Sequence, residues 1–330
     1  MMLPGRDKSS EEFTLDADFV ADCAEGTRRT SNLNNSSKIV GPVNGLICIY
    51  GMGLSERIAL CNPCLRESET LPRSPTSCNI SYEGYFFRCV GLGYDSVQKD
   101  VKIVQMINYF AMEEGEFTHG MLVDVYSRNA KTWRKLVCNV PNTWAMKSIA
   151  ASHNNNGSFF HCLAWEQLRD PNDFCKRLVL SFDVRKEVFR TTLFPPCVYD
   201  GSDYGGRAKV RSKVLSTDNS LFLFVWEDGD KFLDRWVLNG LGNVGRWTRL
   251  SRVGPLLQVS KPVGFWKTNG LVLKYVKEKK LVIYDCSTGE TRNIEIRETV
   301  LCYPKVVGYR GSLVSLAARV VVCPELVKKL

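Results

Sequence analysis

From Lys38 onward one repeating sequence pattern dominates this chain. Short apolar or alternating runs are separated by clusters of Gly, Asn, Asp, Ser and Pro. Such runs are typical of β-strands, and segments with helical periodicity are almost missing. One motif, a turn followed by an apolar strand, recurs at residues 44–49, 156–160, 219–224, 269–273 and 311–314.

A second motif consists of a strand, a polar turn and a short strand, and it recurs at residues 123–136, 180–194, 235–250 and 281–296. The equivalent positions of this second motif are occupied by Trp133, Phe189, Trp247 and Arg292. The resulting period of about 50 residues matches kelch-type blades, which stack radially because one sheet cannot bury both of its faces alone. We therefore expect an all-β fold, a kelch-like β-propeller of about six four-stranded blades. A single β-sandwich is the structural alternative, but it would be a large one.

Composition limits the class and the compartment. The 330 residues are 44% hydrophobic and 24% charged, the balance of a globular protein. We expect a polar, largely irregular N-terminal arm over residues 1–37 and the propeller over residues 38–330. The chain has no apolar run long enough to span a bilayer and no secretory signal, so we expect a cytoplasmic or nuclear protein without membrane contact. The 13 cysteines, an odd number, are then reduced thiols.

Several short motifs follow one another along the chain. They include IVGPVNGLIC (39–48), LCNPCLRES (60–68), GLGYDS (91–96), KIV (102–104), VYS (125–127), SFD (181–183) and YRGSLVSL (309–316). This ordered set resembles the F-box-associated domain of plant F-box proteins, and is similar to S-locus F-box-type proteins. The resemblance spans about residues 38–316. Each motif is weak alone, but the ordered set is specific.

In that family an N-terminal F-box of about 40 to 50 residues docks on the Skp-type adaptor of a cullin-RING ubiquitin ligase, while the associated domain holds the substrate. The first 38 residues here are short and polar and do not resemble an F-box. The resemblance therefore implies a protein substrate. It leaves binding to a Skp-type adaptor and cullin open.

Motifs that suggest cofactor or metal chemistry each have a simpler interpretation. Residues 240–245 match G-x-G-x-x-G, but a short strand follows them, so we expect a hairpin turn. Cys61 and Cys64 form a C-x-x-C pair whose conceivable partners, Cys78 and Cys89, are too far apart for a structural zinc site. The carboxylates of residues 227–234 lack the spacing of a calcium loop and indicate a solvated turn. We expect no catalytic constellation, no cofactor and no metal.

The most distinctive surface signal is a row of cations at Arg207, Lys209, Arg211 and Lys213, which alternate strictly. In an extended strand they would share one face and could receive an acidic substrate segment. The simpler interpretation is an edge strand charged against sheet-to-sheet pairing. No aromatic residues interleave with the row, so nucleic acid is disfavoured.

We expect a non-catalytic substrate-recognition module related to the receptors of SCF ubiquitin ligases. Its partner contacts are expected in two long polar segments, residues 199–213 and 142–156. The first contributes Tyr199, Asp203, Tyr204, Arg207, Lys209, Arg211 and Lys213. Two alternatives stay open. One is a decoy that binds substrate without an F-box, and the other is a propeller oxidoreductase of the copper-oxidase type using His153 and His161.

Overall fold

The structure is a computed structural model that describes residues 38–51, 57–79, 85–113, 116–137, 141, 143–154, 157–166, 176–198, 210–217, 220–227, 230–241, 245–256, 260–266, 269–275, 280–294 and 312–316. Within these ranges no helix is long and apolar enough to cross a membrane.

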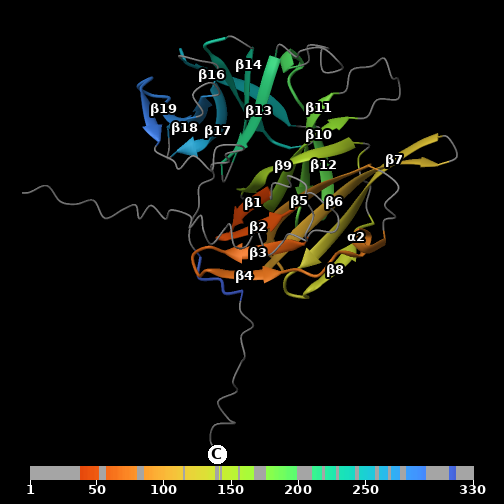
Figure 1. The fold of residues 1–330 in the computed structure, drawn as a ribbon. Coiled ribbons are helices and arrows are strands. Elements are labelled where there is room, and N and C mark those ends of the chain that lie inside the picture. The colour runs from red at the N-terminus through yellow and green to blue at the C-terminus, as the bar shows by residue number, and fades with distance from the viewer. Residues whose placement is uncertain are drawn as a thin grey trace, which may run out of the picture.

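The described strands form five four-stranded antiparallel sheets, each made of strands consecutive in the chain (Figure 1). Blade 1 contains β1 (Lys38–Val43), β2 (Leu46–Tyr50), β3 (Ile58–Asn62) and β4 (Glu67–Thr70). The helix α2 (Pro75–Asn79) leads to blade 2, made of β5 (Tyr85–Asp95), β6 (Asp100–Glu113), β7 (Glu116–Ser127) and β8 (Thr132–Lys135).

Blade 3 contains β9 (Thr143–Asn154), β10 (Gly157–Glu166), β11 (Arg177–Asp183) and β12 (Val188–Leu193), followed by the short helix η1 (Pro196–Val198). Blade 4 contains β13 (Val210–Ser216), β14 (Leu221–Glu227), β15 (Leu233–Asn239) and β16 (Arg246–Val253). Blade 5 contains β17 (Ser260–Trp266), β18 (Gly270–Tyr275), β19 (Lys280–Asp285) and β20 (Thr291–Ile294).

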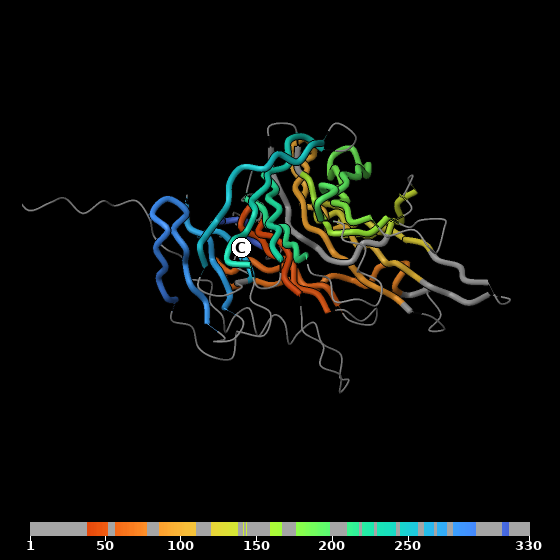
Figure 2. Tube along the Cα trace, turned by 90° about the horizontal axis from the view of Figure 1, so that it is seen from above, coloured from red at the N-terminus to blue at the C-terminus, as the bar shows by residue number. Residues whose placement is uncertain are grey.

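The first strands of the blades gather together. Contacts join β1 to β5, β5 to β9, β9 to β13 and β13 to β17. The fourth strands therefore lie outermost. Figure 2 shows the blades grouped side by side. In Figure 1 the β6–β7 hairpin of blade 2 extends away from the other blades. That hairpin stays paired from Lys102 and Ser127 to Glu113 and Glu116.

The core lies mostly in the seams between consecutive blades. Four clusters of buried apolar side chains join blade 1 to 2, 2 to 3, 3 to 4, and 4 to 5. Two indole groups of outermost strands also bridge blades, because Nε1 of Trp133 donates to the Pro72 carbonyl (2.8 Å) and Nε1 of Trp247 donates to the Leu193 carbonyl (3.0 Å). Burial of apolar side chains in these seams is what stacks the sheets.

The seam between blades 2 and 3 is unusually close. A Cβ atom added to Gly91 would lie 2.3 Å from the ring of Phe160, and one added to Gly93 would lie 2.3 Å from Val184. Both glycines belong to β5, the first strand of blade 2. Blade 3 can approach only because these positions carry no side chain.

Residues 312–316 bind the outer part of blade 1. Nδ2 of Asn62 donates to the carbonyls of Ser312 (2.9 Å) and Val314 (2.8 Å), and the Ser315 hydroxyl donates to the Glu67 carboxylate (2.9 Å). The Leu316 side chain enters the core cluster of blades 1 and 2. Residues 312–316 form no strand. The carbonyls of Ser312 and Val314 therefore accept hydrogen bonds from the Asn62 side-chain amide instead of from a neighbouring strand.

The all-β propeller expected from the sequence is confirmed, but the described blades number five instead of about six. The motif at residues 311–314 resembles the start of a further blade, but residues 312–316 form no strand. Trp133, Phe189 and Trp247 do hold corresponding places, where each pairs with the third strand of its blade. In blade 5 the corresponding residue is Thr291, one position before Arg292.

Candidate functional site

The two faces of the propeller differ in the connections they carry. In each blade the links from first to second strand and from third to fourth strand reach one face, because consecutive strands are antiparallel. We call this the tight-turn face, since several of its links are short turns. The other face, which we call the long-connection face, carries the links at residues 71–84, 167–176 and 194–209.

A polar turn recurs on the tight-turn face. A side-chain oxygen at the end of the third strand accepts N–H groups two or three residues later, and the residue four positions on has a positive φ. Asn and Asp stabilise such turns by imitating a backbone carbonyl. Blades 1, 2, 3 and 5 share this arrangement, with residue pairs Asn62 and Arg66, Ser127 and Lys131, Asp183 and Glu187, and Asp285 and Gly289.

On the long-connection face, buried hydrogen bonds fix the link that carries α2. The carboxylate of Asp124 on β7 accepts the Thr76 hydroxyl (2.7 Å) and the Thr76 N–H (3.2 Å). Nε2 of Gln105 on β6 donates to the hydroxyls of Ser74 (2.6 Å) and Ser77 (2.9 Å). Gln105 and Asp124 are cross-strand partners. This part of the face is therefore held rigidly by blade 2.

The Gln105 side chain continues this row toward blade 1. Its carbonyl oxygen accepts Nε (2.9 Å) and Nη2 (2.6 Å) of the buried Arg88. Nη1 of Arg88 reaches the Gly51 carbonyl of blade 1 (3.3 Å). The charge of Arg88 favours the thiolate of nearby Cys48, but burial outweighs it and raises the pKa of Cys48 to about 12. Cys48 is consequently an unreactive thiol at neutral pH.

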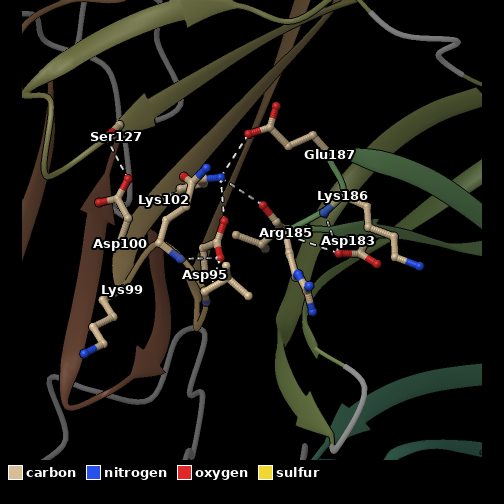
Figure 3. A network of polar contacts seen from close by, with 12 residues as sticks. Asp95, Lys99, Asp100, Lys102, Ser127, Asp183, Arg185, Lys186 and Glu187 are labelled. Carbon is tan, nitrogen blue, oxygen red and sulfur yellow. Dashed lines mark hydrogen bonds and ion pairs between the residues drawn. The ribbon is translucent and has the colours of Figure 1, made fainter.

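A second polar network crosses the seam between blades 2 and 3 on the tight-turn face (Figure 3). Nζ of the buried Lys102 donates to Oδ2 of Asp95 (2.9 Å), to Oε1 of Glu187 (3.1 Å) and to the Val184 carbonyl (3.3 Å). These three bonds use all three N–H donors of the ammonium group. The Arg134 guanidinium also binds Glu187, from a half-exposed position.

The Lys102 network keeps its members ionised. Burial favours the neutral forms of Asp95 and Lys102. The hydrogen bonds and mutual attraction outweigh burial, so the pKa of Asp95 lies below its ordinary 3.8 and the pKa of Lys102 lies above its ordinary 10.5. Lys102 and Arg134 thus compensate the charges of Asp95 and Glu187. The network therefore acts as a structural clamp between blades.

The structure describes two of the seven residues expected to contact a partner. Arg211 and Lys213 lie on β13, where they pair with Trp226 and Phe224; Arg211 is exposed and Lys213 is half-buried. They share the strand face that carries Leu215, which packs toward blade 5. Outside the described residues, and still predictions, are Tyr199, Asp203, Tyr204, Arg207 and Lys209.

The second expected contact segment, residues 142–156, is not a rim loop. Residues Thr143–Asn154 form β9, the first strand of blade 3, which contacts β1, β5 and β13. Its polar composition suggested a loop.

The other motifs fall into separate places. Asn239 pairs with Arg246 across the glycine-rich segment 240–245, which confirms a hairpin between β15 and β16. Within the segment 227–234, where a turn was expected, Oδ1 of Asp230 accepts the Phe232 N–H (3.2 Å). Cys61 and Cys89 lie in different core clusters, and among the described residues no three His, Cys, Asp or Glu side chains gather as a metal site would require.

His161 is a core residue. Its Nδ1 lies 2.8 Å from the Ser181 hydroxyl, and its ring stacks on Phe159. Burial lowers its pKa to about 3, so it is neutral at physiological pH. His153 is three register positions away on the paired strands, a separation of roughly 10 Å. The side chain of His153 lies outside the described residues, so the copper-oxidase alternative keeps only the buried His161 as a described histidine.

These observations define the class of the protein as a β-propeller whose blades are clamped by buried polar networks. A model of the F-box associated beta propeller domain matches residues 9–316. The chain belongs to this family, as the sequence motifs indicated. The match begins within the segment expected to be an arm, and residues 1–37 lie outside the described residues, so the boundary at residue 38 stays a prediction.

Similar proteins from Arabidopsis thaliana are F-box proteins. F-box protein CPR1 is 24% identical, with 93% of this chain and 76% of the relative covered. F-box/kelch-repeat protein At3g23880 is 22% identical over 76% of this chain and 62% of the relative, and F-box protein At5g65850 is 27% identical over 63% and 46%. The chain spans less than two thirds of the last two relatives.

Sequence reasoning missed the polar networks. Lys102 and Glu187 are far apart in the chain, and nothing local marks them as partners. One signal was available, because the Asx or Ser turn repeats in four blades with a fixed offset of four residues. Aligning these turns would have placed Glu187 in a tight turn of blade 3, but would not have shown its contact with Lys102.

Proposed function

We propose that this chain is a non-catalytic, protein-binding module that recognises substrates, related to the receptors of SCF ubiquitin ligases and acting in protein ubiquitination and degradation. The observation that carries the proposal is the family match over residues 9–316 on a propeller framework. The relatives named F-box proteins support the connection to ubiquitin ligases. Assembly with a Skp-type adaptor and a cullin is part of the proposal.

The long-connection face is the proposed binding surface. We propose that the connection at residues 194–209, with Tyr199, Asp203, Tyr204, Arg207 and Lys209, lies on this face, because β12 ends and β13 begins there. The exposed Arg211 is the second residue of β13. The anchored α2 link gives the same face a rigid part. A rigid framework that presents variable connections is the usual arrangement of binding proteins.

The test is a pull-down from plant cell extract, scored by mass spectrometry for Skp-type adaptor, cullin and other proteins. A double variant, Arg207→Glu with Lys209→Glu, reverses two charges on the proposed surface. The matched control, Arg185→Glu with Lys186→Glu, makes the same change in an exposed turn of the tight-turn face. We expect the first variant to lose partners that the control retains.

The outcomes separate the parts of the proposal. Equal partner sets for the two variants would remove the long-connection face from consideration. Partners recovered without adaptor or cullin would indicate a decoy binder and reject the ligase role. Recovery of no protein above a mock control would reject protein binding itself.

A further inference from the structure

Arg235 occupies an unusual position in the seam between blades 4 and 5. It lies on β15 between Leu233 and Val237, two residues whose side chains pack into the core cluster shared by these blades. Its guanidinium carbon lies 4.6 Å from the centre of the Phe222 ring and 5.9 Å from that of Phe265. One ring belongs to blade 4 and the other to blade 5.

One N–H group of the half-buried Arg235 side chain has no acceptor in the part of the chain that the structure describes. Nε of Arg235 is buried without a hydrogen-bond partner, and no described ion pair includes this residue. Aromatic rings attract the cation but accept none of its N–H groups in the way a carboxylate does. A buried donor without an acceptor is rare in folded proteins, so it needs an explanation.

Neighbouring carboxylates are already engaged. Asp234 precedes Arg235 in the strand and therefore points to the opposite face of the sheet, where it binds Arg249 (2.7 Å) and Arg252 (2.9 Å). Oδ1 of Asp285, in the nearby β19–β20 turn, accepts the N–H groups of Ser287 (2.8 Å) and Thr288 (3.3 Å). Neither carboxylate is recorded in an ion pair with Arg235.

The surroundings place the guanidinium near the tight-turn face. Phe222 is the second residue of β14, Phe265 is the next-to-last residue of β17, and both strand ends meet that face. Cys286 in the β19–β20 turn interacts electrostatically with Arg235. Lys213 stands in the same cross-strand row, because Phe224 pairs with Lys213 on one side and with Arg235 on the other.

We propose that Arg235 is the centre of an oxyanion-binding site that takes a carboxylate or phosphate group of a ligand. Two N–H groups of the fork would bind two oxygens in parallel, a geometry that lysine cannot reproduce. Phe222 and Phe265 hold the guanidinium in place and so reduce the entropy lost on binding. The site goes beyond the proposed function, because it lies on the face opposite the proposed substrate surface.

The test follows the Nε–H signal of Arg235 by NMR in arginine-labelled protein, assigned from its absence in Arg235→Lys. Inorganic phosphate and acetate are titrated separately, with chloride at equal ionic strength as the reference. We expect a saturable shift of the Arg235 signal that chloride does not produce, while the exposed Arg252, paired with Asp234, moves much less. A response to phosphate alone or to acetate alone identifies the group and supports the site.

A stability measurement with Arg235→Met separates binding from structural roles. Methionine keeps an unbranched apolar stem but is shorter than arginine and has no N–H donor to bury. We expect the Tm of this variant to be equal to or above that of the wild type, and the rise in Tm caused by the active anion to be lost. The proposal is overturned if the Arg235 signal follows chloride, or if the variant melts lower and keeps the full anion response.

Discussion

Two seams of the propeller surround a cation in opposite ways. Between blades 2 and 3, Lys102 has two carboxylates and a carbonyl around its ammonium group. Between blades 4 and 5, Arg235 lies on two phenylalanine rings, and the described residues offer it no ion pair. The comparison teaches that one seam uses its charge for stability, whereas the other leaves its charge available to a ligand.

The largest expected effect comes from Lys102→Met. The change leaves Asp95 and Glu187 without their shared cation, and removing one partner of a buried pair costs about 3–5 kcal/mol. Urea unfolding at neutral pH should show this decrease in the free energy of unfolding. A change below about 1 kcal/mol would mean that the clamp contributes no more than a surface ion pair, and would break the contrast between the seams.

The close packing of the same seam is tested by Gly91→Ala. The new methyl group would overlap the Phe160 ring, and overpacking costs about 1–3 kcal/mol. The control is Gly120→Ala, where the methyl group would meet the end of the Tyr109 side chain, which can move. Thermal unfolding should lower the Tm of the first variant clearly more than that of the second.

The buried imidazole of blade 3 provides a pH test. The folded pKa of His161, about 3, lies below the ordinary value of about 6.5, so protonation favours the unfolded chain. The stabilisation is present above that ordinary value and is lost as the pH falls toward 3. Between about pH 7.5 and about pH 5 the loss is about 2 kcal/mol.

His161→Gln isolates this contribution. The wild type should lose about 2 kcal/mol more than the variant over that interval, as measured by urea unfolding at both ends. Parallel pH profiles for the two proteins would show that the imidazole is accessible to protons in the folded state.

The smallest effect is expected for Arg134→Met. The Arg134 guanidinium binds the same Glu187 as Lys102 does, but its side chain is 50% exposed. Half-exposed ion pairs contribute about 0–1 kcal/mol because water screens them. Chemical denaturation should therefore show a smaller loss of unfolding free energy for Arg134→Met than for Lys102→Met, because the two cations bind the same carboxylate but differ in burial. An equal loss for both variants would contradict this explanation.

The sequence predicted most of the fold and little of the site. Periodic strands and turn residues are local signals, so the all-β class, the repeat and the equivalence of Trp133 with Phe189 were accessible. The number of blades could not be predicted from such signals. Residues 311–314 have the sequence pattern of a strand, but the carbonyls of Ser312 and Val314 bind the Asn62 side chain. The polar networks depend on contacts between blades, which no local pattern records.

The contact of residues 312–316 with blade 1 also has a consequence for the order of events during synthesis. Asn62 leaves the ribosome 250 residues before Ser312, to which it donates a hydrogen bond. Blade 1 therefore cannot complete its outer contacts until nearly the whole chain has been translated. Closing so long a loop slows folding relative to the local hairpins. We expect the early blades to exist for a time without this final contact, as substrates for chaperones.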